Sequence, residues 1–432
     1  MNFLFFIFIY LIHFIFSRII IPFEKNDIEI KSLKDMMNNI IKCKIEIGNP
    51  SQFLYLGLSL NYHGLLITSK SLNNISFDEL NSNTIYMETS YKNQYIEDKL
   101  NIYGIISIDN FKLLTEDGTK INRNIYFNLV KNSTDNDTLS SGIIGLKIIS
   151  MLIFKEENFI YQLKEQSSIK NYVFSLNFSN ENEGSFIIGN YPDEYDKNYN
   201  EKNYYFTKAL TDEMNVIWEL YFNEIKYGSN IDNNKYFKFN LFINGIIGSN
   251  KYKEFLINNL FNLYLSNNTC KEEFFENFYY NFSGFYCDNN INLKDKFETI
   301  YLYHKEFNFT FNLSYDDLFK IYNNKLYFLV YFKEKNEEWV LGEIFLKKYL
   351  LLFDMERKTI GFYKNNNFVY EIIKNNNKYL LLKIFICILI LCSLLLLFLI
   401  RKYKLKNKMR KNQLNDDDYY YNPKNENYKI FI

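Results

Sequence analysis

The stretch that decides the fold of this chain reads Trp-Val-Leu-Gly-Glu-Ile-Phe-Leu over residues 339–346 and Tyr-Leu-Leu-Leu-Phe-Asp-Met-Glu-Arg-Lys-Thr-Ile-Gly-Phe over residues 349–362. Its apolar runs are short and are bounded by a glycine or a polar turn, which is typical of strands rather than long helices. The same pattern extends back to about residue 20, as short aromatic and β-branched runs separated by Asn, Asp, Gly and Ser. The sequence therefore predicts an all-β region over residues 20–363.

Length, charge and motif content limit the class of protein. A chain of 432 residues can form two lobes with substantial cores. It carries 50 Lys and Arg against 50 Asp and Glu, so its formal net charge is zero. A balanced charge gives no general attraction to nucleic acid, and we expect no nucleic-acid partner. No Cys and His cluster has metal-ligand spacing, so the sequence predicts neither a metal site nor a cofactor.

The two ends of the chain predict targeting and membrane segments. Residues 3–16 are apolar and resemble the central region of a signal peptide over residues 1–17, with an uncleaved anchor as the alternative. Residues 380–400 are apolar except for Lys383 and are long enough to span a bilayer. Seven Lys and Arg follow between 401 and 411, which marks the cytosolic side. We therefore expect a type I single-pass membrane protein with a stalk at 369–379, a transmembrane helix at 380–400 and a cytosolic tail at 401–432. It should reside in endomembranes or the plasma membrane, with its ectodomain lumenal or extracellular.

The order and spacing of the β motifs resemble those of the pepsin-like aspartic protease family. The run at 339–362 is similar to the end of the family's second lobe, and Trp218 stands where that lobe opens. Other matches are Ile-Glu-Ile-Gly-Asn-Pro at 45–50, Tyr-Gly-Ile-Ile-Ser-Ile-Asp at 103–109, Gly-Ile-Ile-Gly-Leu at 142–146, Phe-Ser-Leu at 174–176 and Gly-Ser-Phe-Ile-Ile-Gly at 184–189. The resemblance covers almost the whole region before the span. It implies a bilobal fold with lobes at 18–205 and 206–368, and the composition resembles the plasmepsin branch.

The resemblance also implies where catalytic residues should lie. Family members place one Asp on a loop of each lobe, and the paired carboxylates share a proton because close like charges cannot both ionise. Counting from the matched motifs puts these positions at Ser59, within Ser-Leu-Asn, and at Asn240, within Asn-Leu-Phe. A gapped register would put Asn244 at the second position instead. Neither Ser nor Asn can exchange the required proton, so the expected catalytic set is empty. Asn61 and His63 complete the set of candidate cleft residues.

Other catalytic readings are weaker. Ser59 and His63 are four residues apart, but the sequence identifies neither an orienting acid nor oxyanion donors for a Ser/His hydrolase. The flap position of the family falls at residues 97–98, or at Tyr95 with a gap, and reads as a solvated turn. Glu343 replaces the family's Asp after Gly342, where we expect it to support a loop. His304 is expected in a polar turn.

Cysteines and sequons are consistent with a lumenal region. Cys387 and Cys392 lie in the predicted span, whereas Cys270 and Cys287 lie close together in sequence and should form a disulfide. Cys43 is left over and is expected to be buried as a small apolar residue. N-glycosylation sequons occur at Asn74, Asn132, Asn177, Asn281 and Asn308, among others, and permit a glycoprotein.

The last residues predict a sorting signal. The chain ends with Tyr428-Lys429-Ile430-Phe431-Ile432, and this Tyr-x-x-Phe pattern resembles a signal read by clathrin adaptors. An extended tyrosine motif can add as a strand and fill two pockets, so an adaptor is a candidate partner of the tail. A chance match in a Tyr-rich chain is the alternative.

These observations lead to three functional hypotheses. The first is a pseudoprotease whose inter-lobe cleft binds a peptide or protein. The second is an aspartic-type endopeptidase with non-standard catalytic residues. The third is a structural membrane ectodomain whose cleft has collapsed.

Overall fold

The structure is a computed structural model that describes residues 18–364 except 26–28, 73–75, 97–99, 134–140, 150–157, 212–214, 278–279 and 336. The predicted signal peptide, stalk, span and tail lie outside these residues, as do Asn74 and the flap position at 97–98. Among the described residues, no helix combines the length and apolar character needed to cross a bilayer. The described residues all belong to one compact unit.

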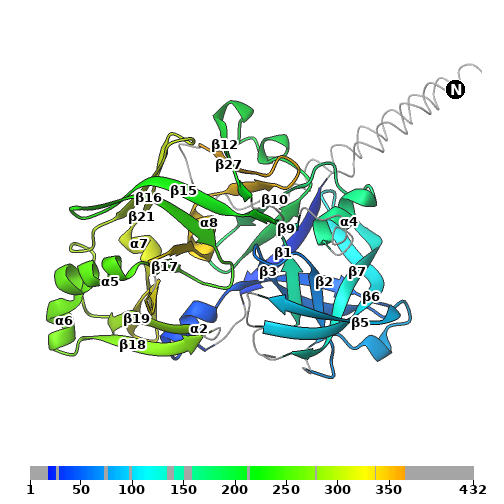
Figure 1. The fold of residues 1–432 in the computed structure, drawn as a ribbon, viewed down its shortest axis with the longest axis horizontal. Coiled ribbons are helices and arrows are strands. Elements are labelled where there is room, and N and C mark those ends of the chain that lie inside the picture. The colour runs from blue at the N-terminus through cyan, green and yellow to red at the C-terminus, as the bar shows by residue number, and fades with distance from the viewer. Residues whose placement is uncertain are drawn as a thin grey trace, which may run out of the picture. The chain divides into compact units, whose positions relative to one another are not determined.

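A larger sheet contains 13 strands within the described part of the chain. Its strands are β1 (Ile19–Lys25), β2 (Ile41–Ile47), β3 (Gln52–Ser59), β4 (Leu65–Thr68), β5 (Tyr86–Ile96), β6 (Leu100–Thr115), β7 (Lys120–Ser133), β8 (Gly142–Gly145), β10 (Val173–Phe178), β11 (Glu183–Ile188), β12 (Tyr204–Lys208), β26 (Leu351–Asp354) and β27 (Thr359–Tyr363). The order is β12-β27-β26-β10-β11-β1-β2-β3-β8-β4-β7-β6-β5. Strands β26 and β27 therefore return from the end of the described chain to pair beside β10 and β12 (Figure 1).

A second sheet has 11 described strands, all from the later part of the chain. They are β15 (Glu219–Tyr227), β16 (Asn230–Phe239), β17 (Ile246–Gly248), β18 (Cys270–Asn277), β19 (Tyr280–Asp288), β20 (Ile300–His304), β21 (Phe309–Leu313), β22 (Phe319–Tyr322), β23 (Lys325–Phe328), β24 (Val330–Lys333) and β25 (Trp339–Leu341). A small third sheet joins β9 (Ile148–Ile149), β13 (Leu210–Thr211) and β14 (Asn215–Ile217).

Helices are short and connect or cover the sheets. The α-helices are α2 (Leu33–Asn38), α4 (Phe159–Glu165), α5 (Asn250–Leu256), α6 (Asn262–Ser266), α7 (Tyr315–Leu318) and α8 (Glu343–Lys348). The 3₁₀ turns are η1 (Glu79–Asn81), η3 (Pro192–Glu194) and η4 (Glu201–Asn203), and a π-helical turn, η5 (Ile257–Phe261), joins α5 to α6.

The two larger sheets repeat one local topology. In the first, β8 lies between β3, to which it is parallel, and β4, to which it is antiparallel. In the second, β25 lies in the same way between β16 and β17. Gly145 in β8 and Gly342 after β25 each stand where two chain segments pass close to each other. An added Cβ on Gly145 would lie 2.4 Å from Gly64 O, and one on Gly342 would lie 2.2 Å from Gly245 O. A side chain at either glycine would therefore separate the crossing segments.

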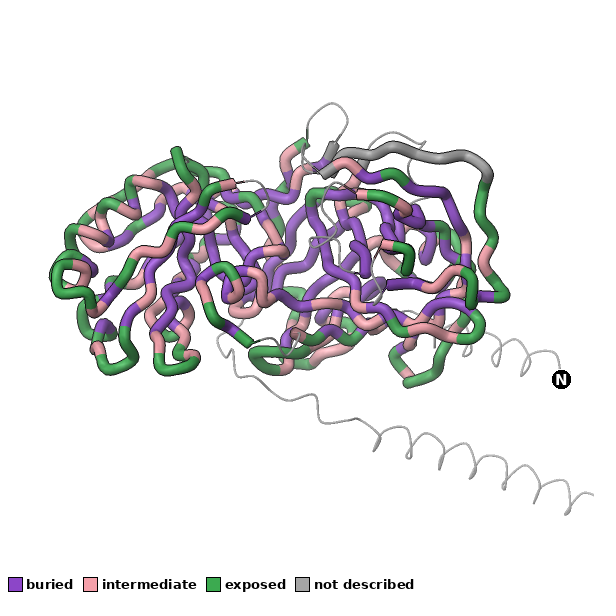
Figure 2. Tube along the Cα trace, turned by 90° about the horizontal axis from the view of Figure 1, so that it is seen from below, coloured by how far each residue is buried: buried purple, intermediate pink, exposed green. Residues whose placement is uncertain are grey.

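Burial follows the geometry of the strands. Strand β2 alternates buried and half-buried residues along its length, as expected for a sheet with one covered face. Trp218 and Trp339 are almost completely buried, and buried segments run continuously through the interior (Figure 2). The prediction of a mostly β, bilobal fold is confirmed.

Residues 116–119 form the turn of a hairpin, because β6 ends at Thr115 and β7 begins at Lys120. The prediction that His304 lies in a polar turn is wrong. Its side chain is 2% exposed at the end of β20 and stacks on Phe307 at 4.0 Å between ring centroids. Burial lowers the pKa of His304 to about 4.

Candidate functional site

The first predicted catalytic position is the last residue of β3. Ser59 is 2% exposed, and its Oγ accepts hydrogen bonds from the backbone N–H groups of Asn61 (3.3 Å) and Tyr62 (3.1 Å). The hydroxyl thus closes the turn that leads to β4, as short polar side chains often do. A serine here shapes the loop but brings no group that ionises at ordinary pH.

The second predicted position has the same local design. Asn240 directly follows β16, and its Oδ1 accepts a hydrogen bond from the backbone N–H of Phe242 at 2.8 Å. Its own N–H donates to Leu341 O in β25 at 2.9 Å. The side chain is half-buried and is an amide, so it too closes a turn without supplying an acid or a base.

The two turns meet through the residues that follow these positions. Asn61 Nδ2 donates to Phe239 O, immediately before Asn240, at 3.4 Å. In the opposite direction, the ring of Phe242 reaches Gly57 in β3, where an added Cβ would stand 2.9 Å from Phe242 Cε1. The ring packs against a buried cluster that belongs to the first sheet and its connections, namely Tyr62, Leu66, Ile102, Val130 and Ile143.

The contacts of Ser59 and His63 bear on the alternative of a Ser/His catalytic pair. Ser59 Oγ faces the N–H groups of its own turn, while the backbone carbonyl of His63 accepts a bond from Asn158 Nδ2 at 3.1 Å. The ring of His63 is tilted against Tyr62 with 5.0 Å between centroids. Among the described residues, no group of three His, Cys, Asp or Glu side chains could hold a metal ion.

Asn244, the gapped alternative for the second position, lies at a different contact. Its backbone N–H donates to Met37 O at 2.8 Å, and its Nδ2 donates to Met36 O at 3.1 Å. Its Oδ1 accepts from Lys25 Nζ at 3.1 Å. Asn244 is buried, at 7% exposed, and it makes hydrogen bonds to three residues from the start of the chain, namely Lys25, Met36 and Met37.

A buried ion pair beside Asn244 was not predicted from the sequence. Lys25 Nζ lies 2.8 Å from Glu343 Oε1, and the two side chains are 8% and 1% exposed. Glu343 Oε2 also accepts from the N–H of Ile41 at 3.0 Å. Glu343 thus does more than support a loop, because it also forms this buried ion pair. The sequence contained one sign of it: a carboxylate that directly follows Gly342 within an apolar run is expected to be buried and to need a charged partner.

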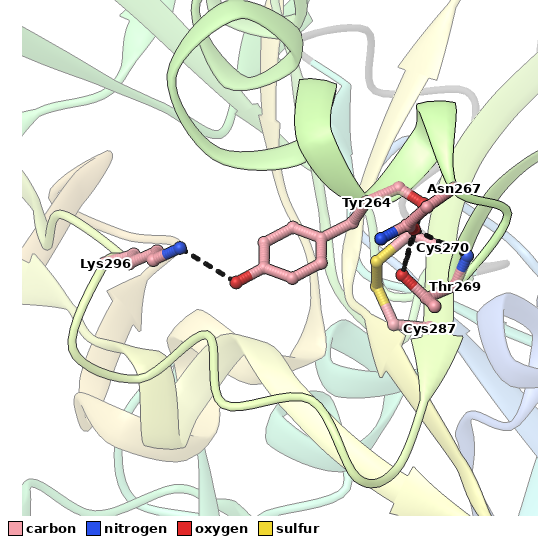
Figure 3. Close-up of a disulfide and its surroundings, with 6 residues drawn as sticks. All are labelled: Tyr264, Asn267, Thr269, Cys270, Cys287 and Lys296. Atoms are coloured by element: carbon pink, nitrogen blue, oxygen red, sulfur yellow. Dashed lines mark hydrogen bonds between the residues drawn. A yellow bond between two sulfur atoms is a disulfide. The ribbon is translucent and has the colours of Figure 1, made fainter.

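The predicted disulfide is present. Cys270 and Cys287 face each other across the β18–β19 hairpin and are bonded (Figure 3). Beside them, Thr269 N–H donates to Tyr264 O at 3.0 Å, and Lys296 Nζ donates to the Tyr264 hydroxyl at 2.9 Å. Cys43 is free and buried, as predicted, and burial raises the pKa of its thiol.

A separate hollow of about 520 Å³ opens beside β18, β19 and β24. Its lining residues include Lys253, Phe274 and Phe332, and none of the predicted cleft residues is among them. Lys253 is already engaged there, with an ion pair to Glu272 at 2.5 Å and a hydrogen bond to Ser283 Oγ at 2.8 Å. The hollow is therefore distinct from the region between the two turns.

Comparisons with known proteins agree with the fold. The family model of the eukaryotic aspartyl protease matches residues 44–365. Among solved structures, the crystal structure of Basic 7S globulin from soybean is similar, with a TM-score of 0.56 and 12% sequence identity over 81% of this chain and 97% of that chain. At this identity the likeness shows the fold alone. No curated protein matches the chain.

Proposed function

The chain belongs to the eukaryotic aspartyl protease family, and we propose that it is a member that binds a peptide or protein partner without cleaving it. The single observation that carries this proposal is the chemistry at the two turns. Ser59 and Asn240 stand at the ends of corresponding strands, and both side chains accept hydrogen bonds from their own turns. The reaction of the family needs a pair of carboxylates at these places. General acid or base catalysis by one such group contributes roughly 100- to 10,000-fold to the reaction rate, and this contribution is lost when the group is missing.

Asn244 supports the binding part of the proposal. Its two N–H groups hold two successive peptide carbonyls, those of Met36 and Met37. Recognition of a main chain in this manner does not depend on side-chain identity and suits a peptide ligand. The surface near the second turn thus has the chemistry to bind a peptide even though the turns cannot hydrolyse one.

The structural hypothesis is the second candidate, because one observation favours it. Phe242 fills the space beside Gly57 and joins a cluster of the first sheet, which fixes the two turns against each other. A chain that only needs a rigid ectodomain would benefit from this packing. Binding of any peptide separates the two candidates, since a purely structural ectodomain should bind none.

The test of the missing reaction uses the purified full chain and a pool of fluorogenic peptides between pH 3 and pH 7. We expect no cleavage above that of the Ser59→Ala/Asn240→Ala double variant, and no tight binding of a pepstatin-type inhibitor, whose hydroxyl is recognised by a carboxylate pair. Strong cleavage that either single substitution abolishes would favour the endopeptidase hypothesis instead.

We also propose that the protein is a type I membrane glycoprotein of the secretory pathway. The apolar run at 380–400 and its basic flank support the span, and the Cys270–Cys287 bridge is consistent with an oxidising compartment. Exposed sequon residues at Asn132, Asn281 and Asn308 could carry glycans. The tail motif at Tyr428 and Phe431 would then face cytosolic sorting adaptors.

A further inference from the structure

A short arm from the start of the chain lies on the second sheet. The arm comprises residues 30–38, includes α2, and is placed next to β18 and β19 (Figure 1). Leu33 N–H donates to Glu273 Oε1 at 3.3 Å, and Asn277 Nδ2 donates to Asn38 Oδ1 at 2.7 Å. At its beginning, Ile30 O accepts from Asn323 Nδ2 at 3.3 Å.

The arm also buries an apolar face. Leu33, Met36 and Met37, spaced as i, i+3 and i+4, are 0%, 5% and 0% exposed. Leu33 lies over β19, where a Cβ on Gly284 would stand 3.3 Å from Leu33 Cδ1. This is the anchor spacing of an amphipathic helix in a groove.

The arm is too short to be helical by itself. Six residues are well below the length at which isolated helices persist in water, even though Ser32 and Asp35 form a capping box. Its conformation therefore depends on the surface beneath it. Asn244 caps the last turn of α2 by holding the carbonyls of Met36 and Met37.

We infer that the surface formed by Asn244, Glu273, Asn277, Gly284 and Asn323 is a binding site for a short helical peptide, and that the chain's own arm occupies it. The partner it fits carries apolar residues at i, i+3 and i+4 after a Ser-x-x-Asp cap. This inference deepens the proposed peptide-binding function and rests on it. It places peptide binding at this surface and specifies the sequence pattern of the peptide.

Occupation from within the chain has a direct consequence for affinity. A tethered segment competes at an effective concentration in the millimolar range for a short connection. Lys25 strengthens the tether, because it pairs with Glu343 and donates to Asn244 just before the arm. A free peptide should therefore bind poorly until the arm is weakened.

The first experiment measures fluorescence anisotropy of a labelled synthetic peptide with the sequence of residues 29–40. In the full chain, Leu33→Asp should release the arm and bind this peptide at least about tenfold more tightly than the wild type. Lys34→Asp is the matched control, since Lys34 is exposed on the same helix, and it should behave as the wild type. A peptide carrying Leu33→Asp should bind neither chain.

A folded Leu33→Asp variant that binds no peptide would overturn the inference. Should that variant fail to fold, hydrogen exchange of the wild type replaces it. Millimolar peptide should then speed exchange of the α2 amides, and unchanged exchange would equally overturn the inference. Cleavage of the bound peptide would contradict the proposed non-catalytic function while leaving the binding site intact, so the two failures are distinguishable.

Discussion

The ring of Phe242 lies against Gly57, so closely that a Cβ on the glycine would stand 2.9 Å from Phe242 Cε1. Phe242 follows β16 of the second sheet, whereas Gly57 is in β3 of the first. In the opposite direction, Asn61 Nδ2 in the turn after β3 donates a hydrogen bond to Phe239 O in β16. The two turns at the predicted catalytic positions are therefore joined by packing and by a hydrogen bond.

This contact predicts coupling between the two residues. Gly57→Ala should destabilise the protein by about 1–3 kcal/mol, because the ring of Phe242 has to move. In a Phe242→Ala background the same substitution should cost little, which gives a coupling of about 1 kcal/mol or more in a double-mutant cycle measured by urea unfolding. Fully additive costs would mean that the ring does not occupy this space.

The buried pair of Lys25 and Glu343 predicts a strong single-site effect. Lys25→Met should lower the free energy of unfolding by about 3–5 kcal/mol, because it leaves the Glu343 carboxylate buried without its cation. The Lys25→Met/Glu343→Gln double variant should recover much of this loss, since glutamine can still accept from Ile41 N–H. Equal stability of the single and double variants in urea titrations would contradict the pairing.

The disulfide predicts a stability difference between cysteines. Cys287→Ser should cost roughly 2–5 kcal/mol by opening the bridge to Cys270. Cys43→Ala is the control, because Cys43 is buried and unbridged, and it should leave the bridge intact. Peptide mapping without reductant checks both variants, and a Cys43 peptide linked to either partner would refute the assignment.

His304 predicts loss of stability in mild acid. Its pKa in the folded state is lowered to about 4, so the unfolded chain takes up the proton more readily. Stability should therefore fall as the pH drops from about 6.5 towards 4, by on the order of 3 kcal/mol from this group. Urea unfolding at several pH values measures the slope.

His304→Asn is the control for this slope. The substitution keeps an acceptor for Phe307 N–H, which now donates to His304 Nδ1 at 3.3 Å, but removes the titrating ring. The variant should be less stable at neutral pH and should lose this part of the pH dependence. The same slope in both proteins would assign it to other groups.

The tail motif predicts a sorting effect without a folding effect. Tyr428→Ala should shift the protein towards a default destination, because the motif loses one of two apolar anchors. Tyr421→Ala, in the same tail but outside the motif, should not. Unchanged localisation of Tyr428→Ala would leave only the topology proposal, which protease accessibility of the tail in cytosol-side-out vesicles tests separately.

The sequence by itself determined the mostly β, bilobal fold, the Cys270–Cys287 pairing and the absence of an acid at Ser59 and Asn240. Local patterns carry this information, because strand periodicity, turn chemistry and residue identity are properties of short segments. Local patterns still led to a wrong prediction for His304. The polar residues around it predicted an exposed turn, but its side chain is buried against Phe307.

Only the tertiary structure decided what lies around the two turns. Three contacts join residues that are far apart in the sequence: Phe242 with Gly57, Lys25 with Glu343, and Asn244 with the arm at residues 30–38. No local pattern encodes which distant side chain fills a given space, because that depends on how the sheets and their connections pack together.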